Sequence, residues 1–347
     1  MEENVLINNQ QKIIDKALEI FKEKNIKVSG KKDIDDMIYH LKYLDLSIDY
    51  DEPRIFSNYF EWLRDVFISY DLSVHELIRS LYAISEAISF LLEENYAKKI
   101  YNIIDSTIQD SINERLRIED KKSNNLENSY LNDDLYSFYN KYLEAILNLN
   151  KDEAFEIVDL MRGKDYRPKE IYLNIFQRAL HKLGELWQKN MISVAQEHYG
   201  TAITRRAMER INLNTEPYDN NSPVFLGVCP PNDNHEVGLR MICDFLESNG
   251  WKTIFIGSSS TISSVLDILK NHSVDVLGIS VSLSIYLKDT EEMINRVKKE
   301  YPEIKILVGG NAINGNERLV KKIGADGTAY DANEIIPVTN KLIKNEL

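Results

Sequence analysis

The sequence predicts a largely helical first half followed by an α/β domain, and two observations indicate this order. Up to about residue 211, apolar residues recur at helical spacing and prolines and glycines are scarce, as in helical bundles. From Val224 onward, short continuous apolar runs alternate with helical stretches, which is typical of buried parallel strands. We therefore expect an N-terminal helical domain (1–125), a four-helix bundle (130–213) and an α/β domain (222–347).

The composition limits the classes of function to consider. The 347 residues carry a formal net charge of −13, which argues against a broad nucleic-acid-binding surface. No apolar run reaches the roughly 20 residues of a membrane span, and the first residues lack the basic-then-apolar pattern of a signal peptide. Because Cys229 and Cys243 are the only cysteines, we expect no disulfide framework and a cytoplasmic location.

Local signals mark helix boundaries in the N-terminal domain. The stretch 51–53 is acidic and ends in proline, as helix starts often do, and Ser73 is suited to cap a later helix. The polar stretch 119–132 lacks an apolar face and is a candidate linker. Apolar stripes at helical spacing predict helices around 14–21, 56–67 and 77–88.

Four further helical patterns with short connections predict the four-helix bundle. They cover residues 135–147, 152–161, 169–186 and 194–211. A second polar stretch, 212–223, contains asparagine, proline and aspartate residues and is the next candidate linker.

The final domain is predicted to hold five strands, each of the first four followed by a helical stretch. The strands are expected at 224–228, 253–256, 274–279, 304–308 and 327–330. Alternating strands and helices predict a doubly wound, flavodoxin-like (Rossmann-like) fold with a five-stranded parallel sheet. Ligands of such folds bind in the loops at the carboxyl ends of the strands.

The loop after the first strand carries the most informative motif of the chain. Asp233, His235 and Gly238 give D-x-H-x-x-G between the strand and an amphipathic helix. A carboxylate two residues before the histidine can accept one ring N–H and leave the other ring nitrogen free to coordinate a metal. The motif therefore predicts His235 as a metal ligand oriented by Asp233.

The other strand-end loops are suited to the same ligand. Residues 257–260, 280–283 and 309–311 follow the second, third and fourth strands and are rich in glycine and serine. Glycines allow the backbone to approach a planar ligand closely, and hydroxyls provide hydrogen bonds to a polar tail.

These motifs resemble the cobalamin-binding domain family, which is marked by D-x-H-x-x-G, then S-x-L, then G-G. The resemblance implies that His235 replaces the vitamin's own base as lower cobalt ligand, with Asp233 as its partner. Ser282 stands where the family often has leucine. The residues implied along the nucleotide tail are Gly238, Ser280, Ser282, Gly309 and Gly310.

A second motif, W-x9-E-H, lies in the predicted bundle. Trp187, Glu197 and His198 resemble the set that caps the upper cobalt face in MerR-type, light-responsive cobalamin repressors. The resemblance implies that Trp187 covers an adenosyl group and that Glu197 and His198 line its pocket. The alternative is that Trp187 belongs to the bundle core and the other two to a helix surface. Gln188 stands where those repressors have a histidine, so capture of cobalt from that position is in doubt, and His198 and His181 remain as alternative ligands.

The N-terminal block, with its Tyr-Phe-Glu-Trp-Leu core at 59–63, resembles stand-alone cobalamin sensors. These include the photocobilins, which hold a bilin beside the cobalamin, so biliverdin or a related bilin is a candidate second chromophore. It would not be thioether-linked in this domain, because both cysteines follow residue 228. The alternative is an aromatic-rich helical core without a chromophore.

The resulting hypothesis is a non-enzymatic adenosylcobalamin photosensor. Light would break the cobalt–carbon bond and shift bundle packing or the state of a homo-oligomer, with a dimer favoured. An unknown output protein would receive the signal, without direct contact to nucleic acid or membrane. The alternative is a corrinoid methyl carrier that serves a methyltransferase, and a third option is a cobalamin chaperone or storage protein.

Overall fold

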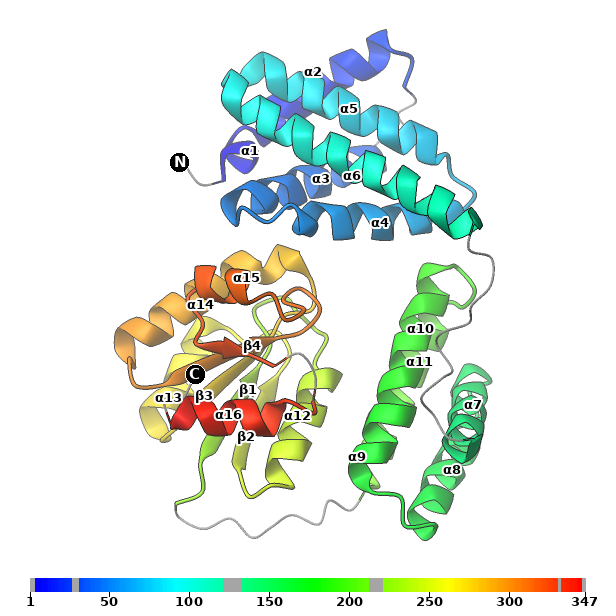
Figure 1. Ribbon diagram of the computed structural model, residues 1–347, viewed down its shortest axis with the longest axis vertical. Coiled ribbons are helices and arrows are strands. Elements are labelled where there is room, and N and C mark those ends of the chain that lie inside the picture. Colours follow the sequence, from blue (N-terminus) through cyan, green and yellow to red (C-terminus); the bar gives the residue numbers. More distant parts are fainter. Residues whose placement is uncertain (1–3, 27–30, 121–132, 212–220, 330–331, 345–347) are drawn as a thin grey trace. The chain divides into compact units, whose positions relative to one another are not determined.

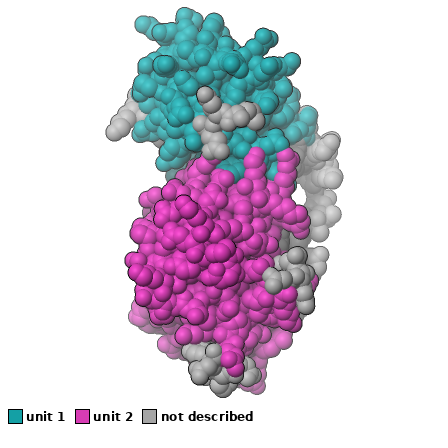
Figure 2. Space-filling view, turned by 90° about the vertical axis from the view of Figure 1, so that its left-hand side faces the viewer, with its two compact units in different colours: residues 1–129, 188–191 teal, residues 130–187, 192–347 magenta. Residues whose placement is uncertain are grey.

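The structure divides the chain into two compact units. The computed structural model describes residues 4–26, 31–120, 133–211, 221–329 and 332–344. By their internal contacts, the first unit comprises 1–129 with 188–191, and the second 130–187 with 192–347 (Figure 2). The second unit therefore combines the predicted bundle with the predicted α/β domain.

The first unit is helical, as the sequence predicts. Ser73 caps the fifth helix by accepting the Glu76 N–H at 3.3 Å, whereas Pro53 lies at the cap of the fourth helix and not inside its first turn. Helix α2 packs on α5, α5 on α6, and α3 on α4 (Figure 1). The helices are α1 (Val5–Asn8), α2 (Gln10–Glu23), α3 (Lys31–Asp49), α4 (Arg54–Ser69), α5 (Val74–Leu91) and α6 (Glu94–Asp120).

The second unit begins with the four-helix bundle. Its third helix differs from the expectation, because the segment η1 (Tyr172–Gln177) is a π-helical insertion between two α-helical parts. Ser193 and Gln196 form a capping box at the start of the fourth helix. The α-helical parts are α7 (Asp133–Leu147), α8 (Lys151–Gly163), α9 (Pro168–Ile171), α10 (Arg178–Gln188) and α11 (Val194–Glu209).

The five-stranded parallel sheet has the order β2-β1-β3-β4-β5, so the predicted fold class is confirmed. The third strand begins at Val276, two residues later than expected, and the side chain of the preceding Asp275 accepts the Val224 N–H at 2.7 Å. The strands are β1 (Val224–Val228), β2 (Lys252–Gly257), β3 (Val276–Ser280), β4 (Lys305–Gly309) and β5 (Gly327–Thr328).

Helices cover both faces of the sheet (Figure 1). Helix α12 packs on α16, and α13 packs on α14. The helices of this part are α12 (Val237–Glu247), α13 (Ile262–Asn271), the 3-10 turn η2 (Ser284–Tyr286), α14 (Leu287–Glu300), α15 (Glu317–Lys322) and α16 (Ile335–Ile343).

One hydrophobic core runs from the bundle into the α/β part. The rings of Tyr172, on the third bundle helix, and Phe245, on α12, have centroids 5.4 Å apart. Strand pairing brings Val228 beside Gly257 and Ser280 beside Gly309, so the loops after the first four strands leave the same edge of the sheet. This edge holds the predicted ligand loops.

Candidate functional site

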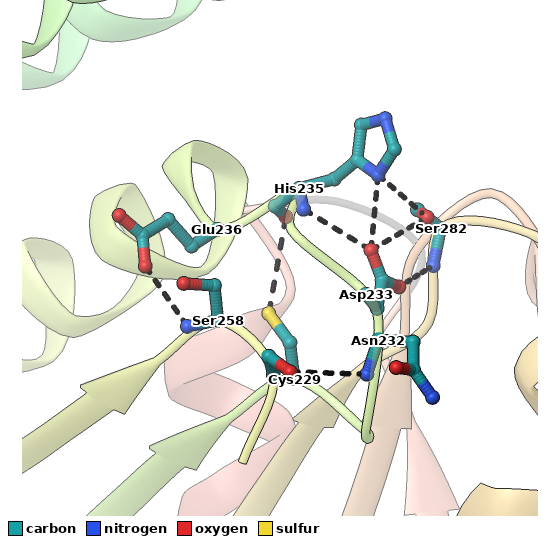
Figure 3. A network of polar contacts seen from close by, with 8 residues as sticks. Cys229, Asn232, Asp233, His235, Glu236, Ser258 and Ser282 are labelled. Atoms are coloured by element: carbon teal, nitrogen blue, oxygen red, sulfur yellow. Dashed lines mark hydrogen bonds and ion pairs between the residues drawn. The ribbon is translucent and has the colours of Figure 1, made fainter.

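Asp233, His235 and Ser282 form one hydrogen-bonded group at this edge (Figure 3). The His235 Nδ1–H donates to Asp233 Oδ1 at 3.0 Å, and the Ser282 hydroxyl donates to the same oxygen at 2.8 Å. The backbone N–H groups of His235 and Ser282 also donate to this carboxylate, at 3.1 and 2.8 Å. Asp233 is fully buried, so these four contacts hold it in one position.

The imidazole of His235 projects away from this group. Its side chain is 66% exposed, and Nε2 points away from Asp233 and Ser282 (Figure 3). Among the described residues, the hydrogen bonds of the ring are all made by Nδ1. A ring with Nδ1 bound to a carboxylate and Nε2 open has the arrangement of a metal-ligating histidine.

The charges of this group are coupled. The hydrogen bond that His235 donates to Asp233 raises the pKa of His235, burial opposes the rise, and the negative charges of Asp233 and Glu197 add to it. Burial alone would raise the pKa of Asp233, but hydrogen bonds from His235 and Ser282 outweigh it and lower that pKa overall. Asp233 therefore stays ionised at neutral pH, which fixes Nδ1 as the protonated nitrogen.

The predicted glycines differ in what surrounds them. A Cβ at Gly238 would meet no atom within 4 Å, and a Cβ at Gly309 only the Ala329 carbonyl oxygen at 3.7 Å. At Gly310, with φ +92°, a Cβ would lie 2.4 Å from the Val281 carbonyl oxygen. Gly310 is thus required by the backbone itself, whereas Gly238, in the first turn of α12, and Gly309, at the end of β4, leave open space.

The residues of the W-x9-E-H motif lie at the same end of two consecutive bundle helices. Trp187 is in the last turn of α10 and is 39% exposed, so it is not enclosed in the bundle core. Glu197 is in the first turn of α11, where it accepts the Thr201 hydroxyl at 2.9 Å and contacts His198 Nδ1 at 2.6 Å. His198 is 75% exposed. Of these residues, Glu197 contributes electrostatically to His235.

Sequence reasoning assigned no role to Glu236, which follows the histidine. Its carboxylate accepts the Ser258 N–H at 2.9 Å (Figure 3) and pairs with Arg205 of α11 at 2.7 Å. Glu197, Thr201 and Arg205 are spaced by four residues, which places them on one face of a helix. In the sequence, this four-residue spacing is the feature that could have placed Arg205 on the same helix face as Glu197.

Cys229 is buried beneath the loop, with its sulfur 3.9 Å from the His235 carbonyl oxygen. Burial raises the pKa of its thiol to about 12, so it is not a reactive thiolate. Nowhere in the part of the chain that the structure describes do three or more His, Cys, Asp or Glu side chains gather as ligands of a bare metal ion. Within the same ranges, no helix combines the length and apolar character needed to cross a bilayer.

Two protein-family models match the second unit. Both are described as a B12 binding domain, and they match residues 139–212 and 223–336. The first range covers the bundle and the second the sheet with its helices. These two parts of the chain therefore match B12-binding domains, which supports a cobalamin or related corrinoid as the cofactor.

Individual relatives agree with this assignment. Dimethylamine corrinoid protein 3 of Methanosarcina acetivorans is 20% identical over 213 residues, which are 60% of this chain and 99% of that protein. The HTH-type transcriptional repressor CarA of Myxococcus xanthus is 21% identical over 156 residues, 44% of this chain and 52% of that protein. The monomethylamine corrinoid protein of Methanosarcina barkeri has the same fold, with a TM-score of 0.52 and 19% identity over 58% of this chain and 97% of that one.

Proposed function

We propose that this protein is a corrinoid carrier that holds a cobalamin through His235 and serves a methyltransferase. The observation that carries the proposal is the buried Asp233, which orients Nδ1 of His235 and leaves Nε2 open. The similarity to dimethylamine corrinoid proteins over nearly their whole length supports the choice of a methyl carrier over a sensor. The proposal includes no bilin, because the relatives named above do not point to one.

The residues present fit the cofactor. A bound cobalamin supplies a cobalt atom that can accept and donate a methyl group. His235 would ligate that metal through Nε2, while Asp233 and Ser282 hold the ring in one orientation. Gly238, in the first turn of α12, and Gly309, at the end of β4, leave space where a flat or extended ligand group can approach the backbone closely.

The experiment that tests the cobalt ligand is electron paramagnetic resonance of the protein loaded with cob(II)alamin. In protein grown on histidine labelled with nitrogen-15, ligation by His235 changes the nitrogen splitting of each line from threefold to twofold. The His235→Ala variant should lose this change, and His272→Ala, which alters an exposed histidine at the end of α13, should keep it. A splitting that is insensitive to the label in the unsubstituted protein rejects the proposed ligand.

A second candidate function is the adenosylcobalamin photosensor. Its specific support is the upper-face motif: Trp187 is partly exposed at the end of α10, and Glu197 lies near enough to His235 to affect its pKa. The CarA relative is a transcriptional repressor, and a repressor, like a sensor, is a regulatory protein. We therefore keep the sensor as the alternative to the carrier.

The two functions differ in how the protein treats the upper ligand. As a carrier, the protein should bind methylcobalamin and adenosylcobalamin with similar affinity, and green light should leave its oligomeric state unchanged. As a sensor, it should prefer adenosylcobalamin, and Trp187→Ala should weaken that binding by about 10-fold but leave methylcobalamin binding unchanged. Titrations in the dark, followed by size-exclusion chromatography before and after illumination, distinguish the two.

A further inference from the structure

Glu236 ties the histidine loop to two other parts of the second unit. It directly follows His235 and occupies the N-cap position of α12 without a side-chain capping bond, and its side chain is only 15% exposed. One carboxylate oxygen accepts the Ser258 N–H at 2.9 Å, which links the loop after β1 to the loop after β2. The other oxygen pairs with the Arg205 guanidinium at 2.7 Å, which links the same loop to the bundle.

The loop after β2 is shaped for this contact. Gly257 has φ +81°, and a Cβ at that position would lie 2.5 Å from Glu236 Oε2. A side chain there would displace the carboxylate from the Ser258 N–H, so glycine is needed for Glu236 to reach its partner.

Helix α11 faces the histidine loop through one polar stripe. Glu197, Thr201 and Arg205 follow at intervals of four residues and lie on one face of the helix. Within the stripe, the Thr201 hydroxyl donates to the Glu197 carboxylate. Both ends of the stripe interact with the loop of His235. The charge of Glu197 raises the pKa of His235, and Arg205 forms an ion pair with Glu236.

The junction beside this ion pair is hollow. A cavity of about 380 Å³ lies between α11 and α12, and Arg205 and Glu236 both line it. Apolar packing therefore does not fill this part of the junction, and the Arg205–Glu236 pair is one of two polar contacts that the described side chains make across it, the other being Tyr172 with Asp244. Because Arg205 is 56% exposed, its ion pair adds little to the stability of the fold. Removing it should leave the protein folded.

We infer that Glu236 and Arg205 are positioning residues, which hold the loop of His235 at a defined place between β2 and α11 so that its imidazole is presented to cobalt in one orientation. The inference rests on the proposed cobalamin ligation. It assigns to Glu236 the larger effect, because this residue makes both contacts, and to Arg205 the smaller one.

The test compares variants of this pair with a neighbouring arginine. Arg206→Ala is the matched control, because Arg206 lies over the Phe155 ring within the bundle and does not line the cavity. Binding of hydroxocobalamin and the histidine-derived nitrogen splitting of bound cob(II)alamin are measured for each variant. We expect Glu236→Ala to weaken binding by about 10-fold, in the range seen when the hydrogen-bonding partners of metal ligands are removed, and to lower the fraction of histidine-ligated cobalt.

Further variants separate positioning from a general loss of structure. Glu236→Gln keeps an acceptor for the Ser258 N–H but loses the charge that pairs with Arg205. It should therefore lower the fraction of histidine-ligated cobalt as much as Arg205→Ala does. Arg205→Lys keeps the positive charge, so its ligated fraction should be close to that of the unsubstituted protein. The double variant Arg205→Ala/Glu236→Gln should be no worse than either single variant, because both remove the same contact. Ligated fractions equal to that of Arg206→Ala in all of these would overturn the inference.

Hydrogen exchange of the cofactor-free protein distinguishes failure of this inference from failure of the proposed function. Glu236→Ala should speed exchange of the Ser258 amide, because its acceptor is removed. It should also speed exchange of the amide of His235, which directly precedes Glu236, because the loop is held less firmly. Arg206→Ala should change neither rate. Unchanged exchange rejects the positioning role even if cobalamin binds. Faster exchange in a protein that binds no cobalamin keeps the positioning role and rejects the proposed cofactor ligation.

Discussion

At the scale of single residues, the site is built around one buried carboxylate. An ionised group without partners would be costly to bury, and Asp233 accepts four hydrogen bonds from His235 and Ser282. Ser282, at the position where the resembled family often has leucine, gives a hydroxyl contact that leucine cannot make. The histidine is therefore oriented by Asp233 of its own loop and by Ser282 of the loop after β3.

The two adjacent glycines allow a prediction that separates folding from binding. Gly310→Ala should lower the free energy of unfolding by about 2–4 kcal/mol, because its Cβ would meet the Val281 carbonyl and its φ is positive. Gly309→Ala should leave stability within about 0.5 kcal/mol but weaken cobalamin binding, since its Cβ enters the open space. Urea unfolding and cobalamin titration check the pair. Equal losses of stability in both variants would contradict this reading of the loop.

At the scale of elements, the third bundle helix is the part that departs from a regular pattern. Its π-helical segment η1 begins at Tyr172, whose hydroxyl donates to Asp244 of α12 at 2.7 Å. Burial raises the pKa of Asp244, and Arg240 also contacts this carboxylate at 3.0 Å. The bundle and the α/β part are thus joined by a buried polar contact within their shared apolar core.

We predict that Tyr172→Phe lowers the free energy of unfolding by about 1–3 kcal/mol, because the buried Asp244 loses a donor while the ring packing is kept. Tyr199→Phe is the matched control: its hydroxyl donates to the Leu149 carbonyl at 2.9 Å in an exposed setting, and its loss should cost under about 0.5 kcal/mol. Urea denaturation followed by circular dichroism measures both. Similar losses in the two variants would show that the contact with Asp244 has no special weight.

At the scale of the whole molecule, the family matches lie in the second unit and begin at residue 139. The first unit has its own core and its own buried titratable group, His40. The ring of His40 contacts the Tyr59 hydroxyl at 2.9 Å, and Tyr59 stacks on Tyr43 with ring centroids 4.0 Å apart. Burial lowers the pKa of His40 from 6.5 to about 4.

This lowered pKa predicts acid sensitivity of the first unit. Below pH 6.5 the unfolded chain protonates His40 while the folded chain does not, so stability falls as the pH drops toward 4. The loss from this group should reach about 3 kcal/mol at pH 4. Unfolding of the full chain, measured between pH 7 and about pH 4, should show less acid loss in His40→Gln than in the exposed control His75→Gln. Parallel pH profiles for the two variants would reject the assignment.

Much of the fold follows from local pattern. Continuous apolar runs predict β1 and β4 within one residue, and Ser73 caps α5 as its residue type predicts. The π-helical segment η1 was missed because its apolar residues also fit an α-helical stripe. The start of β3 lies two residues later than the apolar run predicts, and sequence periodicity does not reveal the side-chain contact of Asp275 with the Val224 N–H.

The sequence by itself determined the order of the helical and α/β parts and identified the loop in which Asp233 orients His235. Both follow from local patterns, because apolar periodicity and the two-residue spacing of Asp233 and His235 involve residues close together in the chain. Only the tertiary structure decided that Ser282, 49 residues from Asp233, completes the group, and that Arg205 reaches Glu236. The pairing of β1 with β3 and the position of α11 across from α12 bring these side chains together. Such contacts arise from the sum of many weak packing interactions across the unit, so no single stretch of sequence encodes them.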